Sequence, residues 1–107
     1  MCIAPLCYTR SMRKLTDAEI ADRLTALDDW SVNGQSIEKV FEFADFMAAI
    51  AFINRLVPTA ETLNHHPDWS NAYNEVRISL TSHDAGGLTD ADFAFASAAD
   101  EAATQTV

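Results

Sequence analysis

Residues 75–96, EVRISLTSHDAGGLTDADFAFA, carry the signals of a strand, a turn and a helix in direct succession. Apolar and polar residues alternate over 75–82, and the apolar positions are Val76, Ile78 and Leu80. A period of two is typical of a strand that buries one face. Gly86-Gly87 then lets the chain change direction within a short space. The stretch therefore predicts a strand that turns sharply into the last helix of the chain.

The helix start in this stretch, LTDADF at 88–93, has a counterpart in LTDAEI at 15–20. In each, a threonine can cap the first turn, an acidic residue three positions later completes a capping box, and two apolar residues form a hydrophobic staple. These residues are Leu15, Thr16, Glu19 and Ile20 in one and Leu88, Thr89, Asp92 and Phe93 in the other. We attribute the likeness to shared capping physics, because the flanking sequences differ.

The two helices that begin there are predicted to be short. The first runs to about Asp28, and its core face consists of Ile20, Leu24 and Leu27. The last runs from about Thr89 to Asp100, and its core face consists of Phe93, Ala96 and either Ala99 or Ser97.

A third helix is predicted between them, from about Asp45 to Leu63. Its apolar residues keep helical spacing, and we expect this stripe to face the core: Phe46, Ile50, Ile53, Val57 and Ala60. Pro58 removes a hydrogen bond to the carbonyl of Asn54 and crowds that carbonyl, so a kink or a short break is expected.

Further strands complete the pattern. Residues 36–43, SIEKVFEF, alternate in the same way as 75–82, and shorter extended pieces are expected at 30–33, ahead of an Asn33-Gly34 turn, and at 69–73. The order is α-β-β-α-β-β-α. Strand pairs joined by short turns predict an α+β fold, in which a four-stranded antiparallel sheet has helices packed on one face. The other face is then either solvated or covered by a partner chain.

The bulk composition fits one globular domain. The chain has 107 residues, of which 49% are hydrophobic and 21% charged. We expect a domain over residues 12–103, a flexible extension over 1–11 and a tail over 104–107, with Met12 as an alternative start. No apolar run approaches the roughly 20 residues of a membrane helix, and the N-terminus lacks the leading basic residues of a signal peptide. Cys2 and Cys7 lie in the extension, where a disulfide would not stabilise the core, and this favours a reducing, cytoplasmic setting.

The charge is strongly acidic, with 7 Lys and Arg against 16 Asp and Glu and a net charge of −9. This balance disfavours a partner such as nucleic acid, because a phosphate backbone requires a basic surface. It does not identify a substrate, since a negative surface often serves solubility.

The three histidines of the chain, His65, His66 and His83, lie in one short span. Pro67 biases His66 away from helical geometry, so the middle helix should end at the histidine pair and the two rings should diverge. A single histidine at a helix end is often only a partner of the helix dipole. Three in one zone favour a function modestly, and such groups usually sit on loops held by a rigid scaffold.

The residues around the histidines also have ordinary structural interpretations. Glu61, four residues before His65, can be solvated surface of the middle helix, and Asp92 is accounted for by its capping box alone. Trp69 belongs either to the core or to a binding site, where an aromatic ring suits a flat heterocycle.

Several kinds of chemistry can be compared at this cluster. Three imidazoles and a carboxylate resemble a zinc ligand set, but adjacent histidines are awkward ligands for one ion and the usual His-x-x-x-His spacing is missing. A cysteine nucleophile is disfavoured, because both cysteines lie in the extension. Metal-free acid–base chemistry remains, because an imidazole with a pKa near ~6.5 can donate or accept a proton at neutral pH.

Residues 60–96 resemble the pterin-4a-carbinolamine dehydratases, a family also known as the dimerisation cofactor of a homeodomain transcription factor. The family pattern is an acidic residue, three spacers, His-His-Pro, an aromatic residue, Tyr-Asn-x-Val, a hydrophobic strand, a histidine, Gly-Leu-Thr/Ser and Asp. The matching positions are Glu61, His65, His66, Pro67, Trp69, Tyr73, Asn74, Val76, His83, Gly87, Leu88, Thr89 and Asp92. A weaker likeness extends over 14–101.

The resemblance implies an α+β fold with three helices on one face of a four-stranded antiparallel sheet, and homodimers or homotetramers that cover open sheet regions. The implied activity is that of a hydro-lyase, which removes water from 4a-hydroxytetrahydropterin without a metal or an organic cofactor. The product, quinonoid dihydropterin, belongs to the recycling of the cofactor used by aromatic amino acid hydroxylases.

The resemblance also implies the site residues. His65, His66 and His83 are the acid–base and pterin-holding set, oriented by Glu61 and Asp92. The implied pterin pocket also takes in Asn64, Pro67, Trp69, Thr81, Ser82 and Asp84.

The chain departs from the family at three positions: Pro58 in a helix that is usually continuous, Ser82 where threonine is common, and Ala91 where some animal members carry arginine. Two other classes stay open beside the dehydratase. One is a non-catalytic interaction module, a role that family members also fill, although a pure scaffold has no reason to keep three histidines. The other is a metal-binding protein, which elemental analysis would identify.

Overall fold

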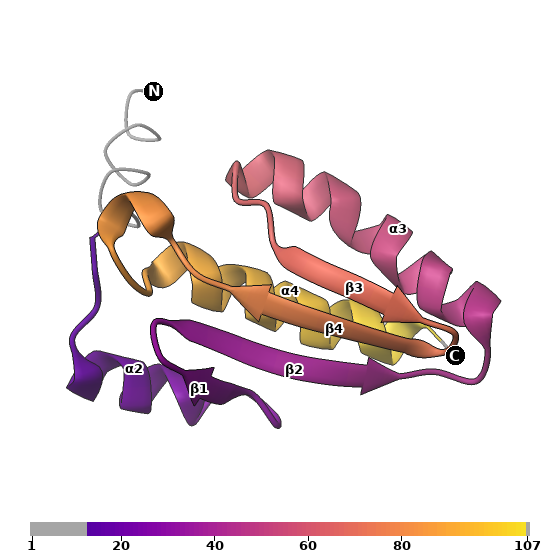
Figure 1. The fold of residues 1–107 in the computed structure, drawn as a ribbon, viewed down its shortest axis with the longest axis horizontal. Coiled ribbons are helices and arrows are strands. Elements are labelled where there is room, and N and C mark those ends of the chain that lie inside the picture. The colour runs from indigo at the N-terminus through magenta and orange to yellow at the C-terminus, as the bar shows by residue number, and fades with distance from the viewer. Residues whose placement is uncertain (1–12, 107) are drawn as a thin grey trace.

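The computed structural model describes residues 13–106, which form four antiparallel strands and three α-helices in the predicted order α-β-β-α-β-β-α (Figure 1). The elements are α2 (Asp17–Leu24), β1 (Ser31–Asn33), β2 (Ser36–Glu42), α3 (Phe46–Leu63), β3 (Asp68–Ala72), β4 (Glu75–Leu80), a single 3₁₀ turn η1 (His83–Ala85) and α4 (Asp90–Gln105). The expectations for the extension over 1–11, for Met12 and for Cys2 and Cys7 lie outside the described residues. Within 13–106, no helix has the length and apolar character needed to cross a membrane.

The sheet has the strand order β1-β2-β4-β3, and every pairing is antiparallel. Figure 1 shows α3 and α4 on one side of the sheet, and α3 packs against both α4 and β4. The side chains that the strands direct toward these helices are buried, as the alternation predicts: Ile37, Phe41, Val76, Ile78 and Leu80. The opposite face carries polar residues, with Glu38 beside Ser79 in the register and in an ion pair with Arg77, and it also carries the half-exposed Val40.

The capping boxes predicted for the first and last helices are both present. The helix ends differ from the prediction, however. The first helix ends at Leu24 rather than near Asp28, and the chain then passes through bends in which Asp29 has a φ of 62°. The last helix continues past Asp100 to Gln105, because the sequence there remains rich in alanine, the best helix former.

The buried face of α3 agrees with the predicted stripe only at Ala60, which is buried, and at Ile53, which is partly buried against the core. Ala49, Phe52, Leu56 and Ala60 are buried, whereas Phe46 and Val57 of the predicted stripe are 48% and 45% exposed. Both sets have helical spacing, since α3 is apolar around most of its circumference. Periodicity alone therefore could not choose between them, and the sheet and α4 decide which face is covered.

Of the kink or short break predicted at Pro58, the break is absent, because α3 is helical from Phe46 to Leu63 without interruption. Pro58 lies on the exposed side of the helix. At such a position water can satisfy the carbonyl that loses its hydrogen bond.

The β1–β2 turn is shifted by one residue from the prediction. Asn33 pairs with Ser36, so Gly34 and Gln35 form the loop, and Gly34 has a φ of 64°. Glycine at the first loop position suits a hairpin turn that requires a positive φ there.

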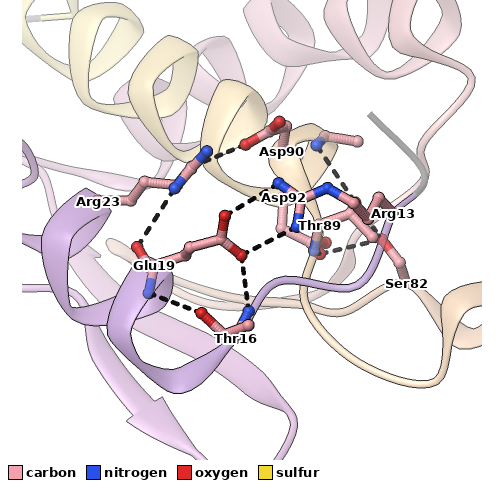
Figure 2. Close-up of polar contacts among 9 residues, drawn as sticks. Arg13, Thr16, Glu19, Arg23, Ser82, Thr89, Asp90 and Asp92 are labelled. Atoms are coloured by element: carbon pink, nitrogen blue, oxygen red, sulfur yellow. Dashed lines mark hydrogen bonds and ion pairs between the residues drawn. The ribbon is translucent and has the colours of Figure 1, made fainter. Parts of the chain in front are cut away.

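Ion pairs connect α2 with the N-terminus of α4 and stabilise the start of α2 (Figure 2). Arg23 Nε donates to Asp90 Oδ1 at 2.7 Å. Both terminal nitrogens of Arg13 donate to the carboxylate of Glu19, each at 3.0 Å. The bond from Arg13, followed by the backbone N–H of Thr16, lowers the pKa of Glu19 from 4.5 to about 2.

Glu19→Gln is therefore expected to reduce stability modestly, in a pH-dependent way. A carboxylate with a lowered pKa in the folded state contributes stability above its ordinary pKa and loses it as the pH falls through the folded value. The difference in urea midpoint between wild type and variant should be full above pH 4.5 and vanish toward about pH 2. The control is Glu101→Gln, because the side chain of Glu101 forms no ion pair with any residue from 13 to 106. A difference that stays constant with pH would contradict the assignment.

Candidate functional site

The site begins where α3 ends. Asn64 follows the last helical residue with a φ of 50°, a left-handed geometry that asparagine tolerates. The N–H of Asn64 donates to the carbonyl of Glu61 at 3.2 Å, and the N–H of His65 to that of Ala60 at 3.0 Å. The helix thus ends immediately before the histidine pair, as predicted, and both histidines project from its end.

His65 is paired with a buried carboxylate from the far end of the chain. Its Nε2 lies 2.5 Å from Oδ1 of Asp92, and Asp92 is fully buried at 0% exposure. The other oxygen, Oδ2, accepts hydrogen bonds from the N–H of Thr89 and from the hydroxyl of Ser82, each at 2.9 Å. Because a carboxylate only accepts hydrogen bonds, the proton of the contact with His65 is carried on Nε2.

His66 makes a similar contact at the surface. Its Nε2 lies 3.0 Å from Oε2 of Glu61, and the two side chains are 61% and 72% exposed. Water and salt weaken such a pair. The two adjacent histidines therefore have carboxylate partners in very different surroundings, and both partners are residues that the resemblance implied.

His83 is the first residue of the turn η1, which follows β4. Ser82 and Gly87 form an isolated bridge that closes this turn, and Gly86 adopts the positive φ of 78° that the turn requires. The ring of His83 is exposed and has no hydrogen-bond partner among residues 13–106. It is thus available to a ligand.

The three histidines line one cavity of about 270 Å³. Its lining consists of Asn64, His65, His66, Thr81, Ser82, His83 and Asp84. All seven belong to the residues predicted for the pocket. The volume lies just below the roughly 300–1,000 Å³ typical of small-molecule sites, and the pocket suits a small polar ring system.

The remaining predicted residues lie behind or beside this lining. Glu61 and Asp92 reach the pocket through the histidines that they contact. Trp69 is half-buried with its ring against Phe95 of α4, at 6.3 Å between ring centroids, and neither it nor Pro67 lines the cavity. A direct role of Trp69 or Pro67 in binding stays a prediction.

Sequence analysis missed the part that Ser82 and Thr89 play beneath the site. Both are buried, and their hydroxyl oxygens lie 2.9 Å apart next to Asp92. The alternation of the strand could have predicted that Ser82 is buried, because Ser82 continues the inward-facing series Val76, Ile78 and Leu80. A hydroxyl on an inward position requires a partner.

The arrangement can move protons. It brings imidazoles with and without carboxylate partners to one small cavity, and an imidazole can donate a proton in its charged form and accept one in its neutral form. Within residues 13–106, no group of three or more His, Cys, Asp or Glu side chains could hold a metal ion.

Comparison with known proteins gives consistent matches. The family model described as pterin 4 alpha carbinolamine dehydratase matches residues 13–102. A curated protein of Sulfurisphaera tokodaii, provisionally named a pterin-4-alpha-carbinolamine dehydratase, is 47% identical over 93 residues, which cover 87% of this chain and 100% of the relative.

Solved structures match as well. The transcriptional coactivator/pterin dehydratase of Brucella melitensis has a TM-score of 0.82 at 39% identity, and the match covers 85% of this chain and 99% of that one. A pterin dehydratase-like protein identified as a RuBisCO assembly factor in the alpha-carboxysome has a TM-score of 0.61 at 26% identity, covering 71% and 90%.

Proposed function

The chain belongs to the pterin 4 alpha carbinolamine dehydratase family, and on this premise we propose that it dehydrates 4a-hydroxytetrahydropterin to quinonoid dihydropterin by metal-free acid–base catalysis. The observation that carries the proposal is the meeting of three histidines at one cavity, one of them hydrogen-bonded to the buried carboxylate of Asp92. A scaffold protein does not require such a pair.

The chemistry matches these groups. In the proposed reaction the C4a–O bond breaks, and the oxygen leaves as water after it takes a proton from an imidazolium. A neutral imidazole takes the proton from N5, and the electrons of the former N5–H bond form the C4a=N5 double bond. His65, His66 and His83 supply the donor and the acceptor. Positive charge develops on the ring as the C4a–O bond breaks and water departs, and carboxylates near the pocket stabilise that charge.

Binding would use the polar lining of the pocket. Asn64 and Asp84 offer amide and carboxylate groups beside the histidines, and the Thr81 hydroxyl, which donates to the carbonyl of Gln35 at 2.6 Å, can accept a further hydrogen bond. A pterin ring has several donors and acceptors at its edge. A few placed polar groups suffice to orient a ligand of this size.

The experiment is a decay measurement. 4a-Hydroxytetrahydropterin is generated with an aromatic amino acid hydroxylase, and its loss is followed by ultraviolet absorbance with and without the purified protein. The proposal predicts faster loss in proportion to protein concentration. An unchanged rate would contradict it. We place the reaction in the cytoplasm, in tetrahydropterin recycling beside an aromatic amino acid hydroxylase.

We also propose that the protein is a homodimer or homotetramer, supported by the exposed apolar face of α3. Phe46 and Val57 are about half exposed at 48% and 45%, and they lie on one side of the helix with the half-buried Ile50. Solvent-facing apolar residues that cluster on one helix face are typical of an interface.

Val57→Asp is therefore expected to lower the oligomeric state, because a carboxylate would be buried without a partner. Light scattering after size-exclusion chromatography measures the mass. Ala51→Asp, on an exposed part of α3 away from this stripe, is the control and should keep the mass of the wild type. Equal masses for wild type and Val57→Asp would contradict this interface.

A non-catalytic interaction module is the second candidate. It is favoured by the structural relative that is identified as a RuBisCO assembly factor and by the same face of α3. The two candidates separate cleanly in the decay measurement, since only the dehydratase predicts that the histidines accelerate the loss of substrate.

A further inference from the structure

We infer that Ser82 is a positioning residue, whose hydroxyl holds the Asp92 carboxylate in place for His65 and whose backbone holds the turn that carries His83. The inference rests on the proposed function and deepens it. It assigns Ser82 a part inside the wall of the pocket, in place of a direct contact with the ligand.

The hydroxyl groups beneath the site have a defined direction. The hydroxyl of Ser82 donates to Asp92 Oδ2 at 2.9 Å. Ser82 has only one hydroxyl proton, so in its 2.9 Å contact with Thr89 the hydroxyl of Thr89 is the donor. Thr89 Oγ1 in turn accepts from the N–H of Ala91 at 3.2 Å. The hydrogen bonds therefore run from the start of α4 through Thr89 and Ser82 to the carboxylate.

Figure 2 shows Ser82, Thr89 and Asp92 together at the N-terminus of α4. Ser82 is 4% exposed, and Thr89 and Asp92 are 0% exposed. A carboxylate at such a depth is stable only when its oxygens are hydrogen-bonded. Oδ2 has two protein donors, which fix the plane of the carboxylate and thereby aim Oδ1 at Nε2 of His65.

The backbone of Ser82 organises the neighbouring turn. Its N–H donates to the carbonyl of Gly87 at 3.2 Å, and its own carbonyl lies 3.1 Å from the nitrogens of Ala85 and Gly86, which donate to it. His83 is the first residue of that turn. One residue thus connects His65, through Asp92, with the segment that presents His83.

The Ser82 hydroxyl could either orient Asp92 or contact the ligand, and the hydrogen bonds distinguish these two roles. Because its proton is used on Asp92, the Ser82 hydroxyl has no proton left for a pterin. Its loss should leave binding intact and loosen the orientation of His65. A hydroxyl that contacts the ligand would instead show its effect in KM.

The test compares Ser82→Ala, Ser82→Thr and wild type, with Ser70→Ala as the control at an exposed position of β3. For Ser82→Ala we expect kcat to fall about 10-fold to 100-fold, less than the ~10²–10⁴-fold that acid–base catalysis supplies as a whole, and KM to stay within about twofold. Ser82→Thr keeps the hydroxyl and should restore kcat. Ser70→Ala should match wild type.

A second readout does not depend on activity. In proton NMR spectra, the Hε2 proton of His65 should be protected from exchange in wild type and Ser82→Thr and should broaden or vanish in Ser82→Ala. If Ser82→Ala fails to fold, Ser82→Cys, which keeps the size with a weaker donor, carries the same comparison. A raised KM with unchanged kcat, or an unchanged Hε2 signal in a folded variant, would overturn the inference. An inactive wild type would overturn the proposed function alone, because the NMR comparison would still decide the role of Ser82.

Discussion

Replacing His65 with alanine is expected to lower kcat for the dehydration by about 10²–10⁴-fold, the contribution of a positioned acid or base. The change removes the ring that meets both the cavity and Asp92. It also leaves the buried carboxylate without its histidine partner, so some loss of stability accompanies it. Initial rates of substrate loss at saturating substrate, divided by the protein concentration, give kcat for each variant.

His66→Ala is expected to abolish the acceleration too, with less effect on stability. The contact between His66 and Glu61 is exposed, and exposed pairs contribute little to folding. Circular dichroism and thermal unfolding should show that both variants keep the fold. Full activity in both would be incompatible with histidine acid–base catalysis.

Asp92→Asn is expected to lower kcat by a similar factor, about 10²–10⁴-fold, while the variant still folds. The amide oxygen can take the place of Oδ2 and accept from Thr89 and Ser82, so the capping box survives. The amide NH₂ then faces Nε2 of His65, where it can only donate. His65 must accept at Nε2 and carry its proton on Nδ1, the opposite tautomer to that of the wild type.

Nitrogen-15 NMR of the histidine rings detects this change directly, beside the activity measurement. Glu19→Gln is the matched control, because Glu19 occupies the corresponding position in the capping box of α2, away from the histidines. The control should keep the wild-type activity and the wild-type tautomer of His65. Wild-type activity in Asp92→Asn would mean that the carboxylate only caps α4 and has no part in catalysis.

Much of the fold followed from local physics. Alternation predicted the buried residues of β2 and β4, and the two capping boxes predicted the starts of α2 and α4, because strand parity and helix capping are decided by neighbouring residues. The end of α3 at the histidine pair was predicted for the same reason, from Pro67 and its effect on the residue before it.

The errors lie where tertiary packing decides. The sequence of α3 offers two apolar stripes, and only its contacts with α4 and β4 bury the one that contains Phe52 and Leu56. Pro58 was expected to kink or break the helix, and its exposed position lets the helix continue without a break. Local rules treat each helix alone and contain no information about which side meets solvent.

The site was predictable as a set of residues and only partly as an arrangement. The resemblance implied that the three histidines, Glu61 and Asp92 act together, and the cavity lining agrees for the histidines. The pairing of His65 with Asp92 and of His66 with Glu61 required the structure, since 27 residues separate the first pair. Ser82 was assigned to binding, although its hydroxyl is directed toward Asp92.

The central claim is that these histidines remove water from 4a-hydroxytetrahydropterin. The most direct measurement is the decay rate of the freshly generated carbinolamine with wild-type protein and with a His65→Ala, His66→Ala double variant that is shown to be folded. The account predicts a rate that rises with wild-type concentration and equals the uncatalysed rate with the double variant. A wild-type rate equal to the uncatalysed one, or a double variant as active as wild type, would contradict it.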